Sequence, residues 1–547
     1  MLLIKCRNIK KYFGDRMILD FDGLEIYSED RIGVVGRNGS GKTTLINILS
    51  QKWKPDEGVV KSYGKITYIS QLESPCRKNV SSEIASKLGI QTTWDKYMSG
   101  GEKTRFKIAQ ALEDKSEIIF ADEPTSNLDM EGIEFIKSKL SEYDGSLVII
   151  SHDRSFLDAL CNRIIEVESG KISIYKGNYS QYKEQKIREN ERAKSEYEEY
   201  IKEKKRLEEV VYKTKDKAKS IKKAPKRMGN SEARLHKMGG QKAKANLEKA
   251  IRNVEKRINH LNVKEKPRAQ SGIKLDILES GKLYCRIILE GKNINKAFGD
   301  KIIFKNASFN IYNGTKTALI GPNGCGKSTL IKMIMDKDVS IRTAQGVKIG
   351  YFSQDLDILK KENTIIDNVM ESSIYPEHFA RLLLARLLLR GETVYKKVGV
   401  LSGGEQVKVS FAKILLQDIN MLILDEPTNY MDISSLEVIE DSLKEYNRTL
   451  LFVSHDRRFI DAVANQIMVI ETQKIKMFAG NYSDYIKRSS DVKDFSEEDM
   501  QKNKIILQNK LSEIIGRLSM PSKKDDVEAL DREYHEIIDK LKQTKKL

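Results

Sequence analysis

Residues 31–49 read RIGVVGRNGSGKTTLINIL, an apolar stretch that leads through a glycine-rich loop into a second apolar stretch. The first five residues predict a buried strand, and the sequence from Lys42 predicts a helix. Glycines at such a junction let backbone N–H groups converge on phosphate at the helix N-terminus. Lys42 would reach the β- and γ-phosphates, and Thr43 would ligate Mg²⁺. The stretch therefore predicts an α/β domain that binds a nucleoside triphosphate.

The chain repeats this pattern. TALIGPNGCGKSTLIKMI, residues 317–334, places Lys327 and Ser328 where the first copy has Lys42 and Thr43, 285 residues earlier. Three further pairs are each separated by 303 residues: Ser99 and Ser402, Glu123 and Glu426, His152 and His455. Because the separation grows after the first pair, the second copy must contain a longer segment ahead of its serine. Self-similarity on this scale predicts two domains of the same fold.

Two carboxylates end an apolar run in each copy. EIIFADEPTSNLD places Asp122 and Glu123 after a predicted buried strand, and NMLILDEPTNYMD does the same for Asp425 and Glu426. The aspartates suit the Mg²⁺ shell, and the glutamates suit polarisation of an attacking water. Acids at a strand end can simply meet solvent, but the repetition of the whole pattern argues against that alternative.

Two further motifs occur in both copies. VIISHD and LFVSHD place His152 and His455 after apolar runs, where they are candidates for contact with the γ-phosphate. MSGGE and LSGGE place Ser99 and Ser402, each with two glycines, before predicted helices. Free N–H groups at these helix starts predict a second phosphate-binding element.

These motifs, in this order and twice, resemble the ATP-binding-cassette family, in which Gln71 and Gln354 would be the Q-loop residues. The resemblance implies ATP hydrolysis with ATP and Mg²⁺ as cofactors. It also implies that the cassettes pair head to tail, so that Lys42 shares a site with Ser402 and Lys327 shares one with Ser99. Phe13 and Phe298 would stack on adenine, although core packing is the alternative for any aromatic residue.

The candidate residues fall into three groups. The catalytic candidates are Glu123, Glu426, His152 and His455. The ATP-binding candidates are Phe13, Gly36, Asn38, Gly39, Gly41, Lys42, Thr43, Thr44, Gln71, Ser99, Gly100 and Gly101, with Phe298, Gly321, Asn323, Gly324, Gly326, Lys327, Ser328, Thr329, Gln354, Ser402, Gly403 and Gly404 in the second copy. The Mg²⁺ candidates are Thr43, Gln71, Asp122, Ser328, Gln354 and Asp425.

Composition limits the class of protein. The formal net charge is +17, which favours a polyanionic partner. The five cysteines are scattered and lack C-x-x-C spacing, which fits a reducing cytoplasm and argues against a disulfide framework or structural zinc. No apolar run is long enough to span a membrane, so a transporter would need partner subunits. Cys325 lies in the second glycine-rich loop, where a helix N-terminus could lower the thiol pKa; a small filler is the simpler interpretation.

The segment between the copies predicts a helical hairpin. Residues 183–222 contain no glycine or proline, and Leu247, Ile251, Val254, Ile258 and Leu261 form a coiled-coil seam on the return. We expect a loop over 224–240, where Pro225 and three glycines interrupt the pattern. Residues 213–244 carry twelve basic and two acidic side chains, whereas 183–212 are neutral. The candidate RNA contacts at this tip are Lys222, Lys223, Lys226, Arg227, Met228, Arg234, His236 and Lys237.

The fold class is therefore α/β, with two P-loop ATP-binding-cassette domains joined by a long α-helical hairpin. The expected boundaries are cassette 1 at 1–182, the hairpin linker at 183–264, a connecting segment at 265–285, cassette 2 at 286–486 and a short helical C-terminal extension at 487–547. We expect a monomer in which the two cassettes pair.

The order of cassette, hairpin and cassette is similar to that of the F subfamily of ATP-binding-cassette proteins. Within it, IKCRNIKKYFGDR, EYEEYIKEKKRLE, VKIGYFSQ and VLSGGEQVKV resemble the Vga-type antibiotic-resistance group. This resemblance implies a cytoplasmic ATPase that binds the 70S ribosome, with its linker near 23S rRNA of the peptidyl-transferase centre and the P-site tRNA. The extension would dock on the small subunit or simply cover the second cassette. Protection against lincosamides, pleuromutilins and streptogramin A would follow. A housekeeping translation factor that relieves stalled ribosomes and an exporter's ATPase subunit stay open as alternatives.

Overall fold

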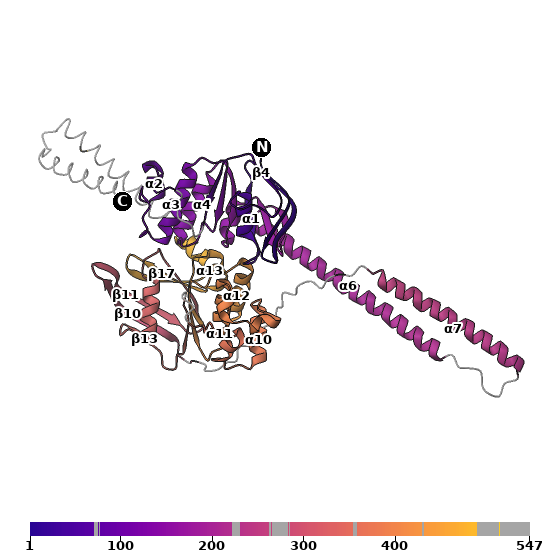
Figure 1. The fold of residues 1–547 in the computed structure, drawn as a ribbon. Helices are drawn as coiled ribbons and strands as arrows, with labels where there is room; N and C mark the ends of the chain where they lie inside the picture. The colour runs from indigo at the N-terminus through magenta and orange to yellow at the C-terminus, as the bar shows by residue number, and fades with distance from the viewer. Residues whose placement is uncertain are drawn as a thin grey trace, which may run out of the picture. The chain divides into compact units, whose positions relative to one another are not determined.

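The computed structural model describes residues 1–70, 75, 77–220, 230–261, 264, 283, 285–353, 358–428, 431–489 and 514, and of residues 230–242 only the backbone (Figure 1). The chain forms two compact units, which we describe one at a time. The first comprises residues 1–93, 106–124 and 139–274, and the second comprises 94–105, 125–138 and 275–547.

The first sequence copy contributes two sheets. A three-stranded antiparallel sheet has the order β2-β1-β4, and a six-stranded sheet has the order β5-β6-β7-β3-β8-β9, in which only β9 runs antiparallel to its neighbour. The strands are β1 Leu2–Phe13, β2 Arg16–Tyr27, β3 Arg31–Val35, β4 Glu57–Ser62, β5 Ile66–Ile69, β6 Ile118–Asp122, β7 Ser146–Ile150, β8 Arg163–Glu168 and β9 Lys171–Lys176. The helices are α1 Lys42–Leu49, α2 Ser82–Leu88, α3 Gly100–Glu113, α4 Met130–Ser141 and α5 Arg154–Leu160.

The second copy repeats this plan. Its sheets have the orders β11-β10-β13 and β14-β15-β16-β12-β17-β18. The strands are β10 Ile287–Phe298, β11 Lys301–Tyr312, β12 Lys316–Ile320, β13 Ile341–Thr343, β14 Ile349–Phe352, β15 Met421–Asp425, β16 Thr449–Val453, β17 Gln466–Glu471 and β18 Lys474–Ala479. The helices are α8 Lys327–Met335, α9 Ile365–Met370, α10 Glu377–Arg386, α11 Gly403–Leu415, α12 Ile433–Glu445 and α13 Arg457–Val463, with 3₁₀ turns η1 Gly391–Tyr395 and η2 Val398–Val400.

The strand sequences explain the layering. β6, β7, β15 and β16 are buried along their whole length, as expected for central parallel strands covered on both faces. Helix α1 lies between the two sheets of its copy, where Ile46 and Leu49 pack with Leu19, Phe21 and Phe120. Parallel strands bring their carboxyl ends to one edge, so the residues after β3, β6 and β7 meet there.

The longer segment predicted in the second copy is confirmed. Between β14 and α11 it contains α9, α10, η1 and η2, whereas the first copy has α2 between β5 and α3. The additional helices belong to a core built on α11 and include Leu383, Leu384 and Val369. The insertion therefore enlarges the helical layer of the second copy.

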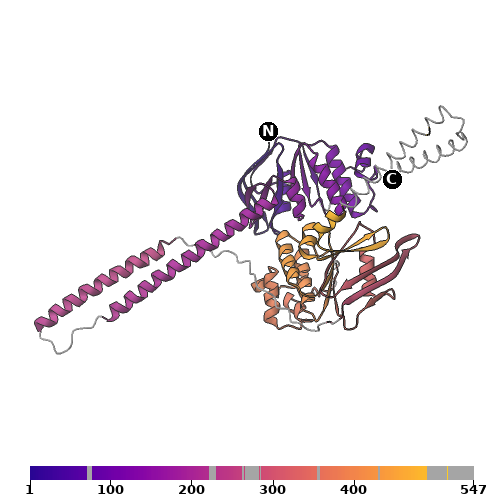
Figure 2. The ribbon, with the colours of Figure 1, turned by 180° about the vertical axis from the view of Figure 1, so that it is seen from behind.

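The hairpin between the copies consists of α6 Tyr179–Ser220 and α7 Asn230–Asn259. The two helices lie side by side and antiparallel, as Figures 1 and 2 both show, and Lys215 pairs with Glu255 at 2.9 Å. Leu207 and Val211 of α6 and Ile251 of α7 are buried, so the predicted seam forms the contact.

The expected loop over 224–240 is wrong in its second half, because α7 already begins at Asn230 and continues through Gly239 and Gly240. A helical glycine costs about 1 kcal/mol relative to alanine, so these two glycines weaken the helix without ending it.

Candidate functional site

The first glycine-rich loop joins β3 to α1. Lys42 is buried, and its Nζ donates to the carbonyl oxygens of Gly36 at 2.9 Å and Arg37 at 3.1 Å. Gly41 holds the N-cap in the left-handed region, with φ 104°, and has no side chain that could cap the helix. A Cβ on Gly36 would lie 2.4 Å from the carbonyl oxygen of Val167, so only glycine fits there. The loop thus leaves the N–H groups at the start of α1 to an anion.

The second loop, between β12 and α8, repeats these contacts. Lys327 Nζ donates to Gly321 O at 2.8 Å and Pro322 O at 3.0 Å. Gly326 takes the same left-handed N-cap conformation, with φ 111°. The other residues predicted to bind ATP lie in the same two loops and in the helices that follow them: Asn38 and Gly39 with Thr44 of α1, and Asn323 and Gly324 with Thr329 of α8.

The predicted Mg²⁺ ligands lie beside these loops. Thr43 Oγ1, in the first turn of α1, donates to Asp122 Oδ2 at 3.1 Å. Asp425 ends β15 in the second copy and is buried, and Ser328 is in the first turn of α8. A hydroxyl beside a carboxylate is a donor set that fits Mg²⁺. The predicted ligands Gln71 and Gln354 lie outside the described residues.

The two glutamates follow β6 and β15 in an unusual backbone conformation. Glu123 and Glu426 have φ 52° and 50°, in the left-handed region that non-glycine residues rarely adopt. Their N–H groups donate across the sheet, to Ile150 O at 2.9 Å and Val453 O at 3.1 Å. These bonds to β7 and β16 hold each glutamate at the carboxyl edge of the sheet, next to the histidine that follows the partner strand.

Each histidine contacts its glutamate. The Nε2 to Oε1 distance is 3.4 Å between His152 and Glu123 and 3.2 Å between His455 and Glu426. Within the described part of the chain, Glu426 Oε2 is buried and has no hydrogen-bond partner. A buried carboxylate oxygen without a donor is costly, so this atom is placed to accept from a ligand or a water. The pairing of acid and imidazole beside the glycine-rich loop fits nucleotide hydrolysis.

Burial shifts the ionisation of these groups. It raises the pKa of the Glu426 carboxyl from 4.5 to about 7, and it raises that of Glu123, where the charge of Asp122 adds to the effect. Burial also lowers the pKa of His455 to about 4, with the positive charge of Lys327 contributing. At neutral pH His455 is therefore uncharged and suits a hydrogen-bonding role more than a charge-neutralising one.

The serines of the two SGGE motifs cap their helices. Ser402 forms a capping box at the start of α11: its N–H donates to Glu405 Oε2 at 2.9 Å, and its Oγ accepts from Glu405 N. Ser99 and Glu102 repeat this arrangement, with the first distance 2.8 Å. Neither glutamate is among the residues predicted from the sequence, although the S-x-x-E spacing is the signal of a capping box.

The candidate adenine-stacking residues end the first strand of each copy. Phe13 closes β1 and is 50% exposed, and Phe298 closes β10 and is 58% exposed. Core packing, the alternative for these aromatics, is therefore wrong. Trp53 lies against Phe13 in an edge-to-face contact, which nothing in the local sequence indicates.

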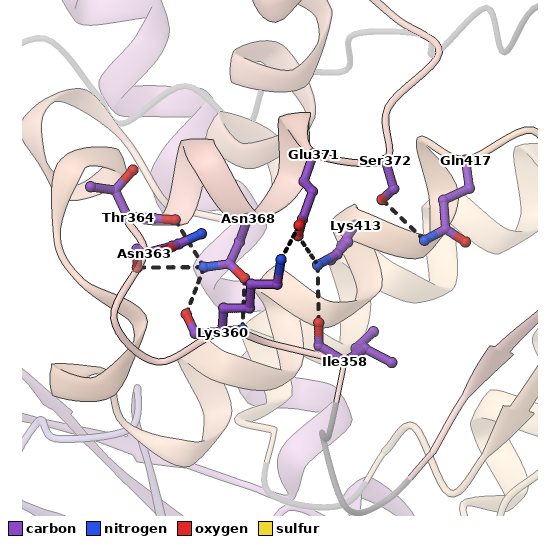
Figure 3. A network of polar contacts seen from close by, with 9 residues as sticks. All are labelled: Ile358, Lys360, Asn363, Thr364, Asn368, Glu371, Ser372, Lys413 and Gln417. Carbon is purple, nitrogen blue, oxygen red and sulfur yellow. Dashed lines mark hydrogen bonds and ion pairs between the residues drawn. The ribbon is translucent and has the colours of Figure 1, made fainter.

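A polar network in the second copy fixes the segment just after the predicted Q-loop (Figure 3). Lys413, buried on α11, donates to Ile358 O at 3.0 Å and pairs with Glu371 at 3.1 Å. Glu371 also pairs with Lys360, whose N–H donates to Asn368 Oδ1 at 2.8 Å. The network fastens this segment to the helix that begins at the SGGE motif.

The first copy fastens the corresponding segment with different residues. Gln110, 303 residues before Lys413, donates to Arg77 O, and Arg77 pairs with Asp114.

Two findings concern groups in the second glycine-rich loop. Burial raises the pKa of the Cys325 thiol, so the idea of a thiol activated by the helix N-terminus is wrong. Within the second unit, Asn323 N donates to Asp129 Oδ2 at 3.0 Å, and Asn323 Nδ2 donates to Asn127 O at 3.3 Å. The residues after the first DEPT motif thus contact the second glycine-rich loop.

The candidate RNA contacts lie where the structure describes little. Lys222, Lys223, Lys226, Arg227 and Met228 are outside the described residues. The backbone at Arg234, His236 and Lys237 is helical, within α7. The predicted helices of residues 487–547 also lie almost wholly outside the described residues. Among the described helices, none is both long and apolar enough to span a membrane.

Comparison with known proteins assigns the class. A family model described as ABC transporter matches residues 20–126 and 304–429, and another with this description matches 165–250. Two similar proteins are the erythromycin resistance ATP-binding protein MsrA of Staphylococcus epidermidis and the ribosome protection protein VmlR of Bacillus subtilis. MsrA is 33% identical over 86% of this chain and 98% of its own, and VmlR is 28% identical over 99% and 98%. The solved structure of the RNase-L Inhibitor has the same fold, with a TM-score of 0.59 at 19% identity over 88% of this chain and 92% of its own.

The chain is thus an ATPase with two nucleotide-binding cassettes. It belongs to the F subfamily of ATP-binding-cassette proteins.

Proposed function

We propose that this ATPase protects the ribosome from antibiotics by an ATP-dependent insertion of its hairpin. The single observation that carries the proposal is the antiparallel pair α6–α7 between the two cassettes, whose far end, residues 213–244, carries twelve basic and two acidic residues. The neutral residues 183–212 of α6 separate this basic segment from the first cassette along the chain. RNA of irregular shape is bound mainly through phosphates and 2′-hydroxyls, which basic side chains suit.

The proposed cycle uses the geometry of both copies. ATP would bind on each glycine-rich loop with Mg²⁺ held by Thr43 and Asp122, or by Ser328 and Asp425. Glu123 and Glu426 would polarise the attacking water, with the histidines on the γ-phosphate. The SGGE helix of the other copy would complete each site, pairing Lys42 with Ser402 and Lys327 with Ser99. Hydrolysis would then separate the cassettes and release the ribosome.

The named relatives support the choice of partner. VmlR is called a ribosome protection protein, and MsrA is called an erythromycin resistance protein. We infer that the chain works in the cytoplasm as a monomer on the 70S ribosome, with the hairpin beside 23S rRNA of the peptidyl-transferase centre and the P-site tRNA. Residues 487–547 would dock on the small subunit. The drugs would be lincosamides, pleuromutilins and streptogramin A.

Susceptibility testing with a redesigned tip tests the proposal. Because α7 begins at Asn230, replacement of residues 221–229 by a Gly-Ser loop of equal length leaves the stem intact. The parent should protect a susceptible host against at least one of the three drug classes, and the variant should not at matched expression. Erythromycin belongs in the panel because of the name of MsrA. Stem variant Arg192→Ala, at an exposed position, is the matched control.

Co-sedimentation separates the outcomes. The double variant Glu123→Gln and Glu426→Gln should hold ATP without hydrolysis and should sediment with 70S ribosomes more strongly with ATP than with ADP. Full protection after the loop replacement would refute the role of the tip. A parent that sediments with ribosomes but protects against no drug would favour a housekeeping translation factor.

A further inference from the structure

An aromatic pair distinguishes the first nucleotide site from the second. The Phe13 and Trp53 ring centroids are 5.7 Å apart, with an angle of 73° between the ring planes. Edge-to-face contact of this kind is a preferred arrangement of two aromatic rings. Trp53 lies in the loop between α1 and β4 and, like Phe13, keeps part of its surface exposed. Phe13 is therefore held by one neighbouring ring while the rest of its surface stays open.

The loop that carries Trp53 is fastened to the end of β1. Asp56 N donates to Lys10 O at 2.9 Å, and Tyr12 N donates to Asp56 Oδ2 at 2.7 Å. Lys11 Nζ donates to Asp56 Oδ1 at 2.9 Å and to Lys54 O at 3.0 Å. This ammonium lies 6.0 Å from the Phe13 ring centroid, at the limit of a cation–π contact. The loop thus holds the two residues that precede Phe13 and also contacts the Phe13 ring.

Trp53 also connects Phe13 to the phosphate-binding helix. Its backbone N–H donates to Asn47 O at 2.9 Å, and Asn47 is a buried residue of α1, the helix that begins at Lys42. A nucleotide that binds this loop places its phosphates at the start of α1 and its base toward the exposed aromatic residue. One rigid chain of contacts therefore runs from the phosphate end to the base end of the first site.

The described residues of the second copy show no such bracing. The residue 285 positions after Trp53 is Asp338, whose carboxylate accepts from Ser340 N at 2.9 Å and Ser340 Oγ at 2.8 Å. Phe298 has Lys296 at 5.9 Å from its ring centroid, much as Phe13 has Lys11. Within the described part of the chain, however, no aromatic ring packs against Phe298. The two copies thus share the stacking residue and differ in what holds it.

We propose that Trp53 is a positioning residue for the adenine base at the first site, and that this site binds adenine nucleotides more tightly than the second. A ring held in place before binding loses less conformational freedom when the base stacks on it. The inference rests on the proposed ATP sites, with Phe13 as the stacking residue.

The experiment measures ADP binding to the full chain by titration calorimetry, one site at a time. Lys327→Ala silences the second site and Lys42→Ala silences the first. In the Lys327→Ala chain, Trp53→Ala should weaken ADP binding by about three- to tenfold. Trp53→Phe keeps an aromatic ring at this position, so its loss of binding free energy should be less than half of the loss caused by Trp53→Ala. In the Lys42→Ala chain, Trp53→Ala should leave ADP affinity unchanged.

Two further readouts exclude a merely structural effect. The chain has two tryptophans, so a Trp94→Phe background makes Trp53 the single indole reporter. Its emission should change with ADP in the Lys327→Ala chain and not in the Lys42→Ala chain. Tyr63→Ala, an exposed aromatic at the opposite end of β1, is the matched control and should not alter ADP affinity.

The outcomes separate the inference from the function on which it rests. Equal ADP affinity with tryptophan or alanine at position 53 overturns the inference, even if Trp53→Ala lowers the melting temperature, and leaves the ATP sites standing. Absence of ADP binding in the Lys327→Ala chain with binding retained in the Lys42→Ala chain overturns the first site itself, and the inference with it.

Discussion

Glu123 and Glu426 combine two features that disfavour folding. Each has a left-handed backbone, and each carries a carboxyl group whose pKa is raised by burial. A non-glycine residue in this conformation costs on the order of 1–2 kcal/mol. Both copies keep the same strained acid beside a histidine. A catalytic role explains this best, since stability alone would favour glycine or asparagine at these positions.

The raised pKa of Glu426 makes a prediction about stability and pH. The folded chain holds this proton up to about pH 7, whereas the unfolded chain loses it near 4.5, so Glu426 lowers stability progressively as pH rises between these values. Glu426→Gln, which keeps the shape without the charge, should therefore gain stability over the parent across this range. The gain should level off above pH 7 at roughly 3 kcal/mol.

Chemical denaturation of nucleotide-free protein at pH 5 and pH 8 measures this gain. Glu392→Gln changes an exposed acid and is a suitable control for loss of one negative charge. A Glu426→Gln difference that is the same at both pH values would contradict the assigned pKa.

At the scale of elements, Lys413 is predicted to hold the helical layer of the second copy together. Lys413→Met removes the donor to Ile358 O and one partner of Glu371, so the second compact unit should lose about 1–3 kcal/mol of unfolding free energy. Lys397→Met breaks an exposed pair with Glu362 and should change stability by less than about 0.5 kcal/mol. Urea unfolding of the parent and of the two variants measures these changes in unfolding free energy. Equal losses for both variants would refute a special role of the network.

The course of α7 gives a second element-scale prediction. Gly239 and Gly240 lie within the helix, so Gly239→Ala with Gly240→Ala should stabilise it by up to about 1 kcal/mol per residue. Amide hydrogen exchange of peptides covering 230–245 should then be slower in the variant than in the parent. Equally fast, unprotected exchange in both chains would place these glycines in a loop, as the sequence pattern alone indicates.

Elements with a local cause could be predicted from sequence, and those with a distant cause could not. The strand, loop and helix around Lys42 follow from apolar runs and glycines that are adjacent in the chain. Helix α7 starts at Asn230 and continues through Gly239 and Gly240 although both glycines disfavour a helix locally. Trp53 meets Phe13 only because β4 returns beside β1. The capping glutamates are an intermediate case. The S-x-x-E spacing is a local signal in the sequence, and it is sufficient to predict both capping boxes.

At the scale of the whole molecule, the two copies are alike where chemistry is expected and different elsewhere. Both keep the lysine on the loop carbonyls, the strained glutamate and the capped SGGE serine. They differ in the helical layer, in the network after the Q-loop and in the bracing of the stacking residue. Two sites with the same catalytic groups and different surroundings should both hydrolyse ATP, with different affinities.

The basic tip gives the prediction on which the ribosome proposal depends most. Changing Lys222, Lys223, Lys226 and Arg227 to glutamine should weaken binding to 70S ribosomes. It should also reduce the slope of log affinity against log salt by up to about 0.7 to 0.9 for each phosphate that the tip no longer neutralises. ATP turnover without ribosomes should not change, because α6 is 42 residues long and separates the tip from the first cassette. Co-sedimentation at several salt concentrations gives the slope.

A matched control removes four basic residues from the stem instead of the tip: Arg188, Arg192, Arg206 and Arg257, each exposed and each paired with a stem glutamate. If net charge alone attracted the chain to the ribosome, both quadruple variants would lose affinity and salt dependence equally, since each removes the same charge. If the tip meets phosphate directly, the tip variant becomes far weaker than the stem variant. An equal effect would therefore contradict direct binding by the tip. It would leave only long-range attraction, which does not require a hairpin of this length.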